Sequence, residues 1–343
     1  MFLYETLFLI SVFLILFVIL KKFNILRDNT DYSNHKIIGS ENKSPVLIGG
    51  IFIFISILIF VKFDDNLITL FYLLILLLGV LSDIDYLPNP SLRLILQIII
   101  ITFFVITQNL SIDSLSLGFF DELLRYKELN IFFTVFCLTV LLNGSNFIDG
   151  LNGLLSGYLI LICSSLTLVA SSSNFINILY PDLFKIFTIS VIIFFVFNLF
   201  GRVYLGDSGS YLSSFIIGTA LISINSENIL ISPYYVALLL WYPAFENFFS
   251  LMRRVFIKSN ISIADKLHLH QLLYRYIRKK KKFNLKIVNS ISGMIIIIFN
   301  LPSFIVGTYY FFHTKILIII LIFNVILYSL SYFILFKNSK NYK

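Results

Sequence analysis

Charged residues are scarce in this sequence. Lys, Arg, Asp and Glu together make up 13% of the 343 residues, whereas 58% of the residues are hydrophobic. An ordinary soluble domain has about 25% charged and about 45–50% apolar residues. A soluble core cannot bury this much apolar surface, so the composition excludes an ordinary soluble protein and predicts a protein embedded in a membrane.

Cysteine is almost absent as well. Cys137 and Cys163 are the two cysteines, and both lie inside apolar runs. Two such thiols exclude a disulfide framework and a cysteine-based zinc site, so we interpret both as packing residues. No basic segment precedes the first apolar run (2–20) and no small-residue cleavage site follows it. This run is therefore interpreted as a membrane span and not as a signal peptide.

Eleven apolar runs follow one another along the chain. A helix needs about 20 apolar residues to cross a bilayer, and several of the runs are shorter. The sequence therefore predicts an all-α, polytopic bundle of about 10–11 transmembrane helices that forms one integral-membrane domain over residues 1–343. The runs lie near residues 2–20, 46–61, 67–82, 92–107, 130–146, 153–171, 183–199, 209–225, 229–249, 286–311 and 315–336.

The basic residues predict the orientation of the bundle. If the N-terminus lies outside, 21 of the 26 Lys and Arg residues fall in inside segments and five fall in outside segments. Because cytoplasmic loops are enriched in Lys and Arg, we expect the N-terminus outside and the C-terminus in the cytoplasm. The same enrichment explains the net charge of +8 without a nucleic-acid partner. The cytoplasmic segments are then 21–45, 83–91, 143–153, 200–208 and the basic loop 250–285.

Polar clusters occupy the inner ends of several predicted spans. Asp83 ends one span and Arg93 opens the next. Ionisable residues at this depth are costly and usually functional. The pattern therefore indicates a functional site at the inner membrane surface. A charged loop that only ends the helix is the alternative.

A second cluster contains Asn143, Asn146 and Asp149. These residues are three apart, so in a helix they share one face, and Gly150 and Gly153 allow a ligand to approach the backbone closely. Amide and carboxylate oxygens suit a hard cation such as Mg²⁺. An amide-rich helix cap is the alternative interpretation.

A third cluster surrounds Asp207, which lies between Gly206 and Gly209. Ser208 or Ser210 can cap the following helix. A helix N-terminus favours phosphate and the carboxylate favours a cation, so this segment suits a metal–diphosphate complex. The alternative is a simple capped turn.

The fourth cluster lies in the basic loop, where His268 and His270 form an H-x-H pattern. Two histidines without a nearby cysteine are weak support for a metal site. The basic run 278–282 is interpreted as a contact with anionic lipid or as a determinant of topology.

Taken together and in this order, the motifs resemble those of the polyprenyl-phosphate N-acetylhexosamine-1-phosphate transferases. This is glycosyltransferase family 4, which includes WecA-like, WbpL-like and MraY-like enzymes. The chain departs from the family pattern at three positions. Ser82 replaces the first Asp of an aspartate pair, Asn152 replaces the second Asp of D-G-x-D-G, and Gln271 replaces the last His of H-x-H-H. The matching segments are Lys43-Ser-Pro45 with Gly49-Gly50, Ser82-Asp83 with Leu87, Arg93 and Gln97, Asn143 to Leu154, Leu205 to Ser210, and His268 to Leu272.

The resemblance implies an enzyme of the bacterial inner membrane whose active site faces the cytoplasm. It would transfer N-acetylhexosamine 1-phosphate from a UDP-sugar to undecaprenyl (polyprenyl) phosphate, release UMP and initiate a surface glycan such as O-antigen or capsule. Mg²⁺ is the implied cofactor, with Mn²⁺ as a substitute. The implied catalytic residues are Asp83 and Asp207, and the implied metal ligands are Asn146 and Asp207. The implied substrate-binding residues are Lys43, Arg93, Asn143, Asp149, Asn152, His268, His270 and Arg275.

Other functions stay open on the sequence alone. An MraY-type phospho-MurNAc-pentapeptide transferase is one, although that branch has a Lys soon after the aspartate pair and a longer His run. The three departures raise the alternative of an inactive family member. A secondary transporter is the alternative of another class, but transporters place their polar residues near the bilayer midplane. A homodimer is compatible with the sequence, although no residue argues for it.

Overall fold

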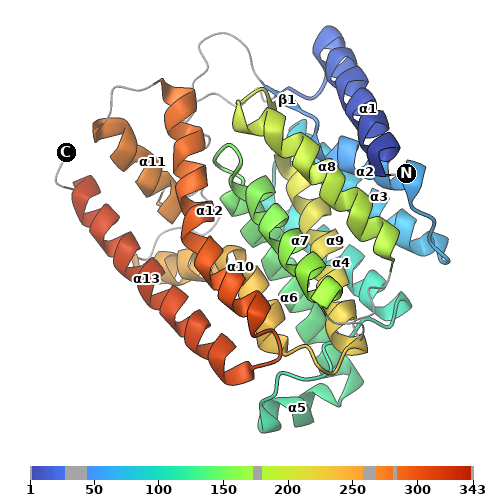
Figure 1. The fold of residues 1–343 in the computed structure, drawn as a ribbon, viewed down its shortest axis with the longest axis vertical. Coiled ribbons are helices and arrows are strands. Elements are labelled where there is room, and N and C mark those ends of the chain that lie inside the picture. The colour runs from blue at the N-terminus through green and yellow to red at the C-terminus, as the bar shows by residue number, and fades with distance from the viewer. Residues whose placement is uncertain (1, 28–44, 173–179, 258–266, 281–283, 341–343) are drawn as a thin grey trace.

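Helices make up almost the whole structure. The computed structural model describes residues 2–27, 45–172, 180–257, 267–280 and 284–340. Figure 1 shows a bundle of helices, and within the described residues β1 and β2 form a two-stranded sheet. The elements are α1 (Phe2–Phe23), β1 (Val46–Leu47), α2 (Gly49–Phe60), α3 (Asn66–Asp83), α4 (Pro90–Thr107), α5 (Gly118–Leu124), α6 (Lys127–Ile148), α7 (Leu154–Ser172), α8 (Pro181–Leu199), β2 (Val203–Tyr204), α9 (Gly206–Glu227), α10 (Pro233–Ile257), α11 (Leu269–Lys280), α12 (Leu285–Tyr309) and α13 (Thr314–Lys340).

Each of the eleven predicted apolar runs forms a helix, and the predicted all-α fold is confirmed. A helix satisfies its own backbone hydrogen bonds, which is required where no water is present. Among the described residues, eight helices are long and apolar enough to cross a membrane: α1, α3, α4, α6, α7, α8, α12 and α13. The other three predicted spans differ. With 12 residues α2 is about 18 Å long, which is shorter than a bilayer core, and α9 and α10 are more polar.

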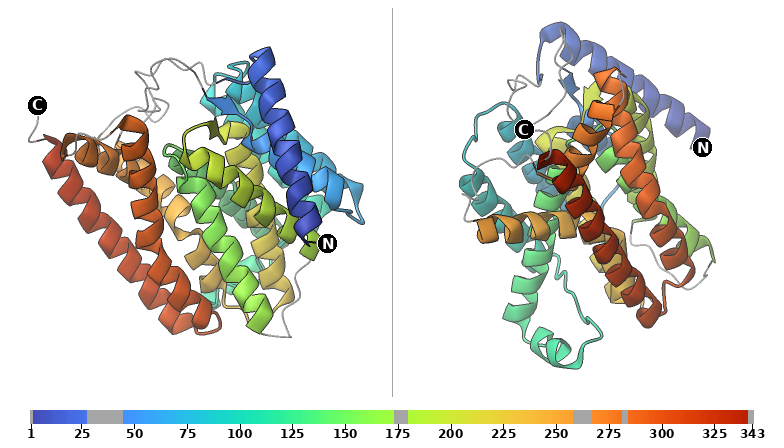
Figure 2. Two further views of the ribbon diagram at one scale, coloured as in Figure 1. Left: turned by 45° about the horizontal axis from the view of Figure 1, so that its top comes forward. Right: turned by 90° about the vertical axis from the view of Figure 1, so that its left-hand side faces the viewer.

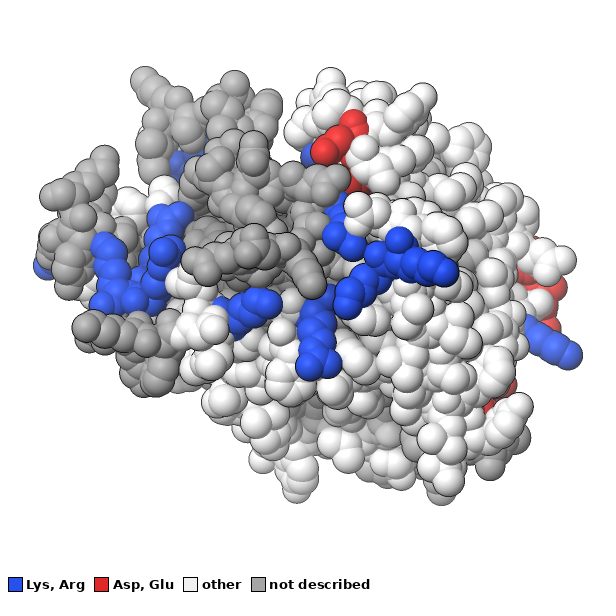
Figure 3. Space-filling view, turned by 90° about the horizontal axis from the view of Figure 1, so that it is seen from above, with Lys and Arg blue, Asp and Glu red and all other residues white. Residues whose placement is uncertain are grey.

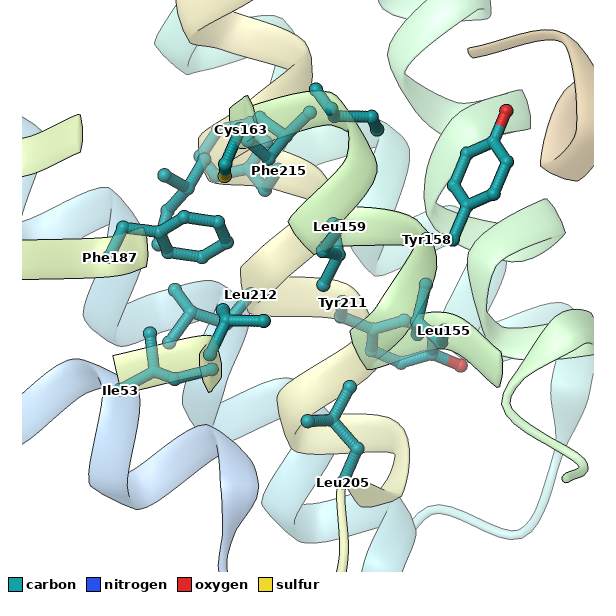
Figure 4. Close-up of a cluster of buried hydrophobic side chains, with 14 of the residues drawn as sticks. Ile53, Leu155, Tyr158, Leu159, Cys163, Phe187, Leu205, Tyr211, Leu212 and Phe215 are labelled. Atoms are coloured by element: carbon teal, nitrogen blue, oxygen red, sulfur yellow. The ribbon is translucent and has the colours of Figure 1, made fainter. Parts of the chain in front are cut away.

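Helix α9 lies at the centre of the bundle, with 16 of its 22 residues buried. Figure 4 shows its apolar side chains among those of α2, α7 and α8. This packing fixes a helix whose N-terminal turn carries Asp207. The side chains in this cluster include Ile53, Leu155, Leu159, Phe187, Tyr211, Leu212 and Phe215.

Two close approaches place the start of α9 next to α3 and α2. A Cβ atom on Gly79 of α3 would come within 2.3 Å of the Ser208 Cα atom, so only glycine allows this contact. Strand β1 pairs in parallel with β2, with Val46 opposite Val203. The segment before α2 is therefore held beside the segment before α9.

Strand β1, helix α11 and many Lys and Arg side chains lie at one end of the bundle. In Figure 1, β1, α11 and the C-terminal end of α13 lie at the upper end, and α5 lies at the opposite end. The two views of Figure 2 agree with this arrangement. Viewed from above, the upper end displays many Lys and Arg side chains (Figure 3). The orientation of this end toward the cytoplasm stays a prediction.

Candidate functional site

The carboxylate of Asp83 lies at the N-terminus of α9. Its two oxygens accept hydrogen bonds from the backbone N–H groups of Asp207 (2.8 Å) and Ser208 (3.0 Å). A helix N-terminus leaves such N–H groups without partners inside the helix and favours negative charge. Gly206 has a φ of +74°, and a Cβ atom there would lie 2.7 Å from Asp83 Oδ2. Asp83 therefore acts as a cap, supplied by α3, that holds the first turn of α9.

The carboxylate of Asp207 forms the centre of the cluster. Its Oδ2 atom accepts hydrogen bonds from Arg93 Nη1 (2.8 Å) and from Ser82 Oγ (2.6 Å), and Arg93 also contacts the Ser82 hydroxyl. The Arg93 and Asp207 side chains retain 23% and 19% of their exposure. The structure thus brings together Asp83, Arg93 and Asp207, three of the residues singled out in the sequence. From α3, the Ser82 hydroxyl contacts the Asp207 carboxylate, whereas the Asp83 carboxylate contacts the Asp207 backbone N–H group.

The two asparagines of α6 lie against α4 and α9. Asn143 donates to Gln97 Oε1 (2.8 Å) on α4. Asn146 accepts from Ser210 Oγ (3.3 Å) and donates to the Tyr211 hydroxyl (3.3 Å), both in the first turns of α9. Asn146 therefore reaches the helix end that carries Asp207. Sequence reasoning gave Gln97 no role, although its place four residues after Arg93 puts both on one helix face.

A carboxylate and an amide oxygen near the start of α9 fit a hard cation. The hydrogen bonds of the Asp207 carboxylate within the described residues all end on Oδ2, so its Oδ1 atom has coordination capacity. Ser210 Oγ contacts both Asn146 Oδ1 (3.3 Å) and the Asp207 backbone oxygen (3.2 Å). The Asp207 carboxylate and the Asn146 amide oxygen are ligands of the kind that Mg²⁺ prefers.

The loop after α6 is anchored to α12. Asn152 is 2% exposed, and its backbone N–H donates to Asn289 Oδ1 (2.6 Å). Its side-chain amide lies 3.4 Å from the Ser290 hydroxyl. Asn152 is thus enclosed by protein, whereas the half-buried Asp149 ends α6 and leads into this loop.

The H-x-H segment packs onto the same end of α6. The rings of His268 and His270 are stacked, with centroids 5.4 Å apart, and His268 lies 5.2 Å from the ring of Phe147. His270 Nε2 faces Gly150, where an added Cβ atom would lie 2.7 Å away. The two histidines therefore point to the same side, as an extended segment predicts, and α11 begins between them at Leu269.

His270 is completely buried. Burial, together with the nearby His268, lowers its pKa to about 3, against a smaller opposing effect of Glu246. The ring is therefore neutral at physiological pH. Neither of its nitrogens has a hydrogen-bond partner within the described residues.

Glu246 is a buried acid to which the sequence analysis gave no role. Its Oε1 atom lies 2.9 Å from His268 Nδ1. A carboxylate inside an apolar run is a signal for function, but the sequence does not show which group it meets. Arg275, a predicted substrate-binding residue, lies half-buried on α11, five residues after His270. Lys43 lies outside the described residues.

Comparisons with known proteins identify the family. The model of glycosyl transferase family 4 matches residues 66–225. A Bacillus subtilis protein, named a probable undecaprenyl-phosphate N-acetylglucosaminyl 1-phosphate transferase, is 26% identical over 71% of this chain and 69% of its own length. A Thermotoga maritima undecaprenyl-phosphate alpha-N-acetylglucosaminyl 1-phosphate transferase is 30% identical over 83% of this chain and 85% of its own length. With this similarity and its apolar helices, the chain is a multi-pass membrane protein that belongs to glycosyl transferase family 4.

Proposed function

We propose that this chain transfers N-acetylhexosamine 1-phosphate from a UDP-sugar to undecaprenyl phosphate or another polyprenyl phosphate and releases UMP. The observation that carries the proposal is the meeting of Asp83, Arg93 and Asp207 where α3, α4 and α9 end or begin. The names of both relatives support the same reaction and make UDP-N-acetylglucosamine the first donor to test. The product would initiate a cell-surface glycan such as O-antigen or capsule.

The reaction must bring two anionic phosphates together. An oxygen of the lipid phosphate attacks the sugar-linked phosphorus of the UDP-sugar, and the bond from that phosphorus to the UMP oxygen breaks. Neutralisation of charge and in-line placement dominate such a transfer. Arg93 is held beside Asp207 and is partly exposed. Its planar guanidinium suits diphosphate oxygens, so it would bind them there.

Asn146 and Asp207 would hold a Mg²⁺ ion, and Mn²⁺ would accept the same oxygen ligands. When bound, the ion would neutralise charge on the diphosphate. Within the described residues, no three His, Cys, Asp or Glu side chains lie close enough to bind a metal together. The two protein oxygens therefore need substrate phosphate oxygens and water to complete the ligand set, which is the usual arrangement for Mg²⁺.

Asp83 would serve the reaction in two ways. Its carboxylate holds the turn that carries Asp207, and the same carboxylate would accept a proton from the lipid phosphate or orient that phosphate. Asp149 and Asn152, just after α6, would bind the nucleotide, and Lys43 would bind the diphosphate. His268, His270 and Arg275 would contact the sugar or its phosphate.

We further propose that this site faces the cytoplasm of a bacterial cell, where UDP-sugars are found. The Lys and Arg side chains at the same end of the bundle support this orientation (Figure 3). Single cysteines at positions 113 and 340 would test it with an impermeant thiol reagent in intact cells. Labelling is expected at 113, and labelling at 340 would overturn the orientation.

The reaction itself is tested with purified protein, undecaprenyl phosphate, Mg²⁺ and labelled UDP-N-acetylglucosamine. We expect a labelled lipid diphosphate product and one UMP released for each product formed. UDP-N-acetylgalactosamine and UDP-MurNAc-pentapeptide as donors separate the sugar choices. Failure with every donor, in protein that is folded and inserted, would favour an inactive family member or a transporter.

A further inference from the structure

Two side-chain hydrogen bonds join α10 to α13. Glu246 Oε2 accepts a hydrogen bond from the Tyr328 hydroxyl (2.8 Å), and Arg253 Nη1 donates to the Tyr332 hydroxyl (2.8 Å). Glu246 and Arg253 are seven residues apart on α10, and the tyrosines are four residues apart on α13. Each pair therefore lies on one face of its helix.

Glu246 and Arg253 also contact the H-x-H segment. Glu246 Oε1 contacts His268 Nδ1 (2.9 Å) and accepts from the backbone N–H of Leu269 (3.3 Å). Arg253 Nη1 donates to the backbone oxygen of Leu267 (2.6 Å). Three consecutive residues before and at the start of α11 are thus fixed to the α10–α13 pair.

The Glu246–His268 contact is buried, with side-chain exposures of 1% and 5%. A buried carboxylate needs donors, and Glu246 receives them from Tyr328, Leu269 and the imidazole. An ionised carboxylate only accepts hydrogen bonds, so the His268 Nδ1 atom must carry the proton. In the neutral ring this fixes the tautomer and leaves Nε2 as the acceptor nitrogen.

We propose that Glu246 is a positioning residue that acts through His268. It fixes the tautomer and the orientation of His268 against Phe147, at the end of α6 where Asn146 contacts α9. This inference rests on the proposed function, because it gives His268 a part in the use of the UDP-sugar. It differs from a general structural role, because it predicts that the effect of Glu246 disappears when His268 is removed.

A double-mutant cycle tests this coupling. Glu246→Gln keeps the shape of the side chain but removes the charge and replaces one acceptor oxygen with an NH2 donor. It should lower kcat/KM for the UDP-sugar by about 10- to 100-fold, the range known for carboxylates that orient metal-bound histidines. In a His268→Ala background the same substitution should change kcat/KM less than about twofold. Equal losses in both backgrounds would overturn the proposal.

Tyr328→Phe is the matched control, since it removes a hydrogen bond to Glu246 without touching His268. It is expected to lower the thermal midpoint while changing kcat/KM for the UDP-sugar by less than about threefold. Glu246→Asp, which restores the charge on a shorter side chain, should recover part of the activity that Glu246→Gln loses. A loss with Glu246→Asp as large as that with Glu246→Gln would contradict a role for the charge.

A measurement that needs no turnover separates this inference from the proposed reaction. The chain has four histidines, so imidazole ¹⁵N signals of labelled protein can be assigned by single substitutions. We expect the His268 signal to report a protonated Nδ1 and to move in Glu246→Gln but not in Tyr328→Phe. If the wild type makes no lipid product, the proposed function fails and the ¹⁵N signal decides the positioning role. An unmoved signal in Glu246→Gln would refute that role.

Discussion

The candidate site has two halves that are built differently. The carboxylate half consists of Asp83, Arg93 and Asp207, and the side chains of its Arg93–Asp207 ion pair remain 23% and 19% exposed. The histidine half consists of Glu246, His268 and His270, and the side chains of its Glu246–His268 pair are only 1% and 5% exposed. The residues of a partly exposed ion pair can exchange each other for a substrate or a cation at little cost. If one residue of a buried pair leaves, the other remains as an unpaired buried charge, which strongly destabilises the protein. The first half is suited to bind, and the second to hold a fixed geometry.

The two halves also come from different parts of the chain. The carboxylate half lies within residues 66–225, the range matched by the family model, and the histidine half follows it. They meet at the end of α6, where Asn146 contacts α9 and Phe147 contacts His268. A change in one half should therefore affect the other mainly through this helix end.

Asp207→Asn should give the largest effect, because it removes the negative charge from the exposed half. An amide can still accept from Ser82 and Arg93, so we expect a thermal midpoint close to that of the wild type. The rate kcat/KM should fall about 1000-fold, or about 4 kcal/mol, together with the affinity for Mn²⁺. Product formation and Mn²⁺ binding by purified protein measure the two effects. Full turnover in excess EDTA would argue against any metal role.

Asp83→Asn should follow, with a loss of about 100-fold in kcat/KM, roughly 2.7 kcal/mol. Asp83 accepts hydrogen bonds from two backbone N–H groups. The NH2 group of Asn would face one of these N–H groups and could not accept from it, so the first turn of α9 should loosen. Loss of such a cap costs about 0.5–2 kcal/mol of unfolding free energy, which thermal or denaturant unfolding in detergent would detect. Ser82→Ala is the control and should cost less than about tenfold. Equal, mild effects would mean that the turn is only structural.

His270→Ala tests the buried half. Removal of a fully buried ring leaves a cavity next to Gly150, so the residues after α6 that are proposed to bind the UDP-sugar should lose their local geometry while α3, α4 and α9 stay in place. We expect kcat/KM for the UDP-sugar to fall by one to two orders of magnitude, about 1.4–2.7 kcal/mol, with the KM for polyprenyl phosphate nearly unchanged. His313→Ala, in the turn between α12 and α13, is the matched control. Equal weakening of both substrates would show that the segment acts as a general structural support.

The smallest effect concerns pH. The pKa of His270 is about 3 in the folded protein and 6.5 in its ordinary state, so the unfolded chain binds more protons between these values. Stability from this residue is complete above pH 6.5 and is lost as the pH falls toward 3. Between pH 6.5 and 5 the loss should be about 2 kcal/mol, seen as a lower thermal midpoint. His270→Phe should flatten this dependence, and an unchanged slope would contradict burial of the ring in the folded state.

The sequence predicted the long apolar helices of the bundle far better than the short helices α5 and α11. Each of the eleven apolar runs is a helix, because a long apolar segment in a membrane must satisfy its own backbone hydrogen bonds. The search for apolar runs did not predict α5 and α11. The first has seven residues, and the second mixes apolar with basic residues, so neither forms an apolar run.

Within the candidate site, the sequence identified residue types and tertiary structure decided their partners. The motifs placed Asp83, Arg93 and Asp207 at the inner ends of predicted spans. They did not predict that Asp83 would cap α9, a contact between residues 124 positions apart. Nor did they predict that Glu246 would meet His268. Hydrophobicity is a local property and determines where helices form. Which side chains meet depends on the approach of helices distant in sequence, as between Gly79 of α3 and Ser208 of α9, and only the packed bundle determines that approach.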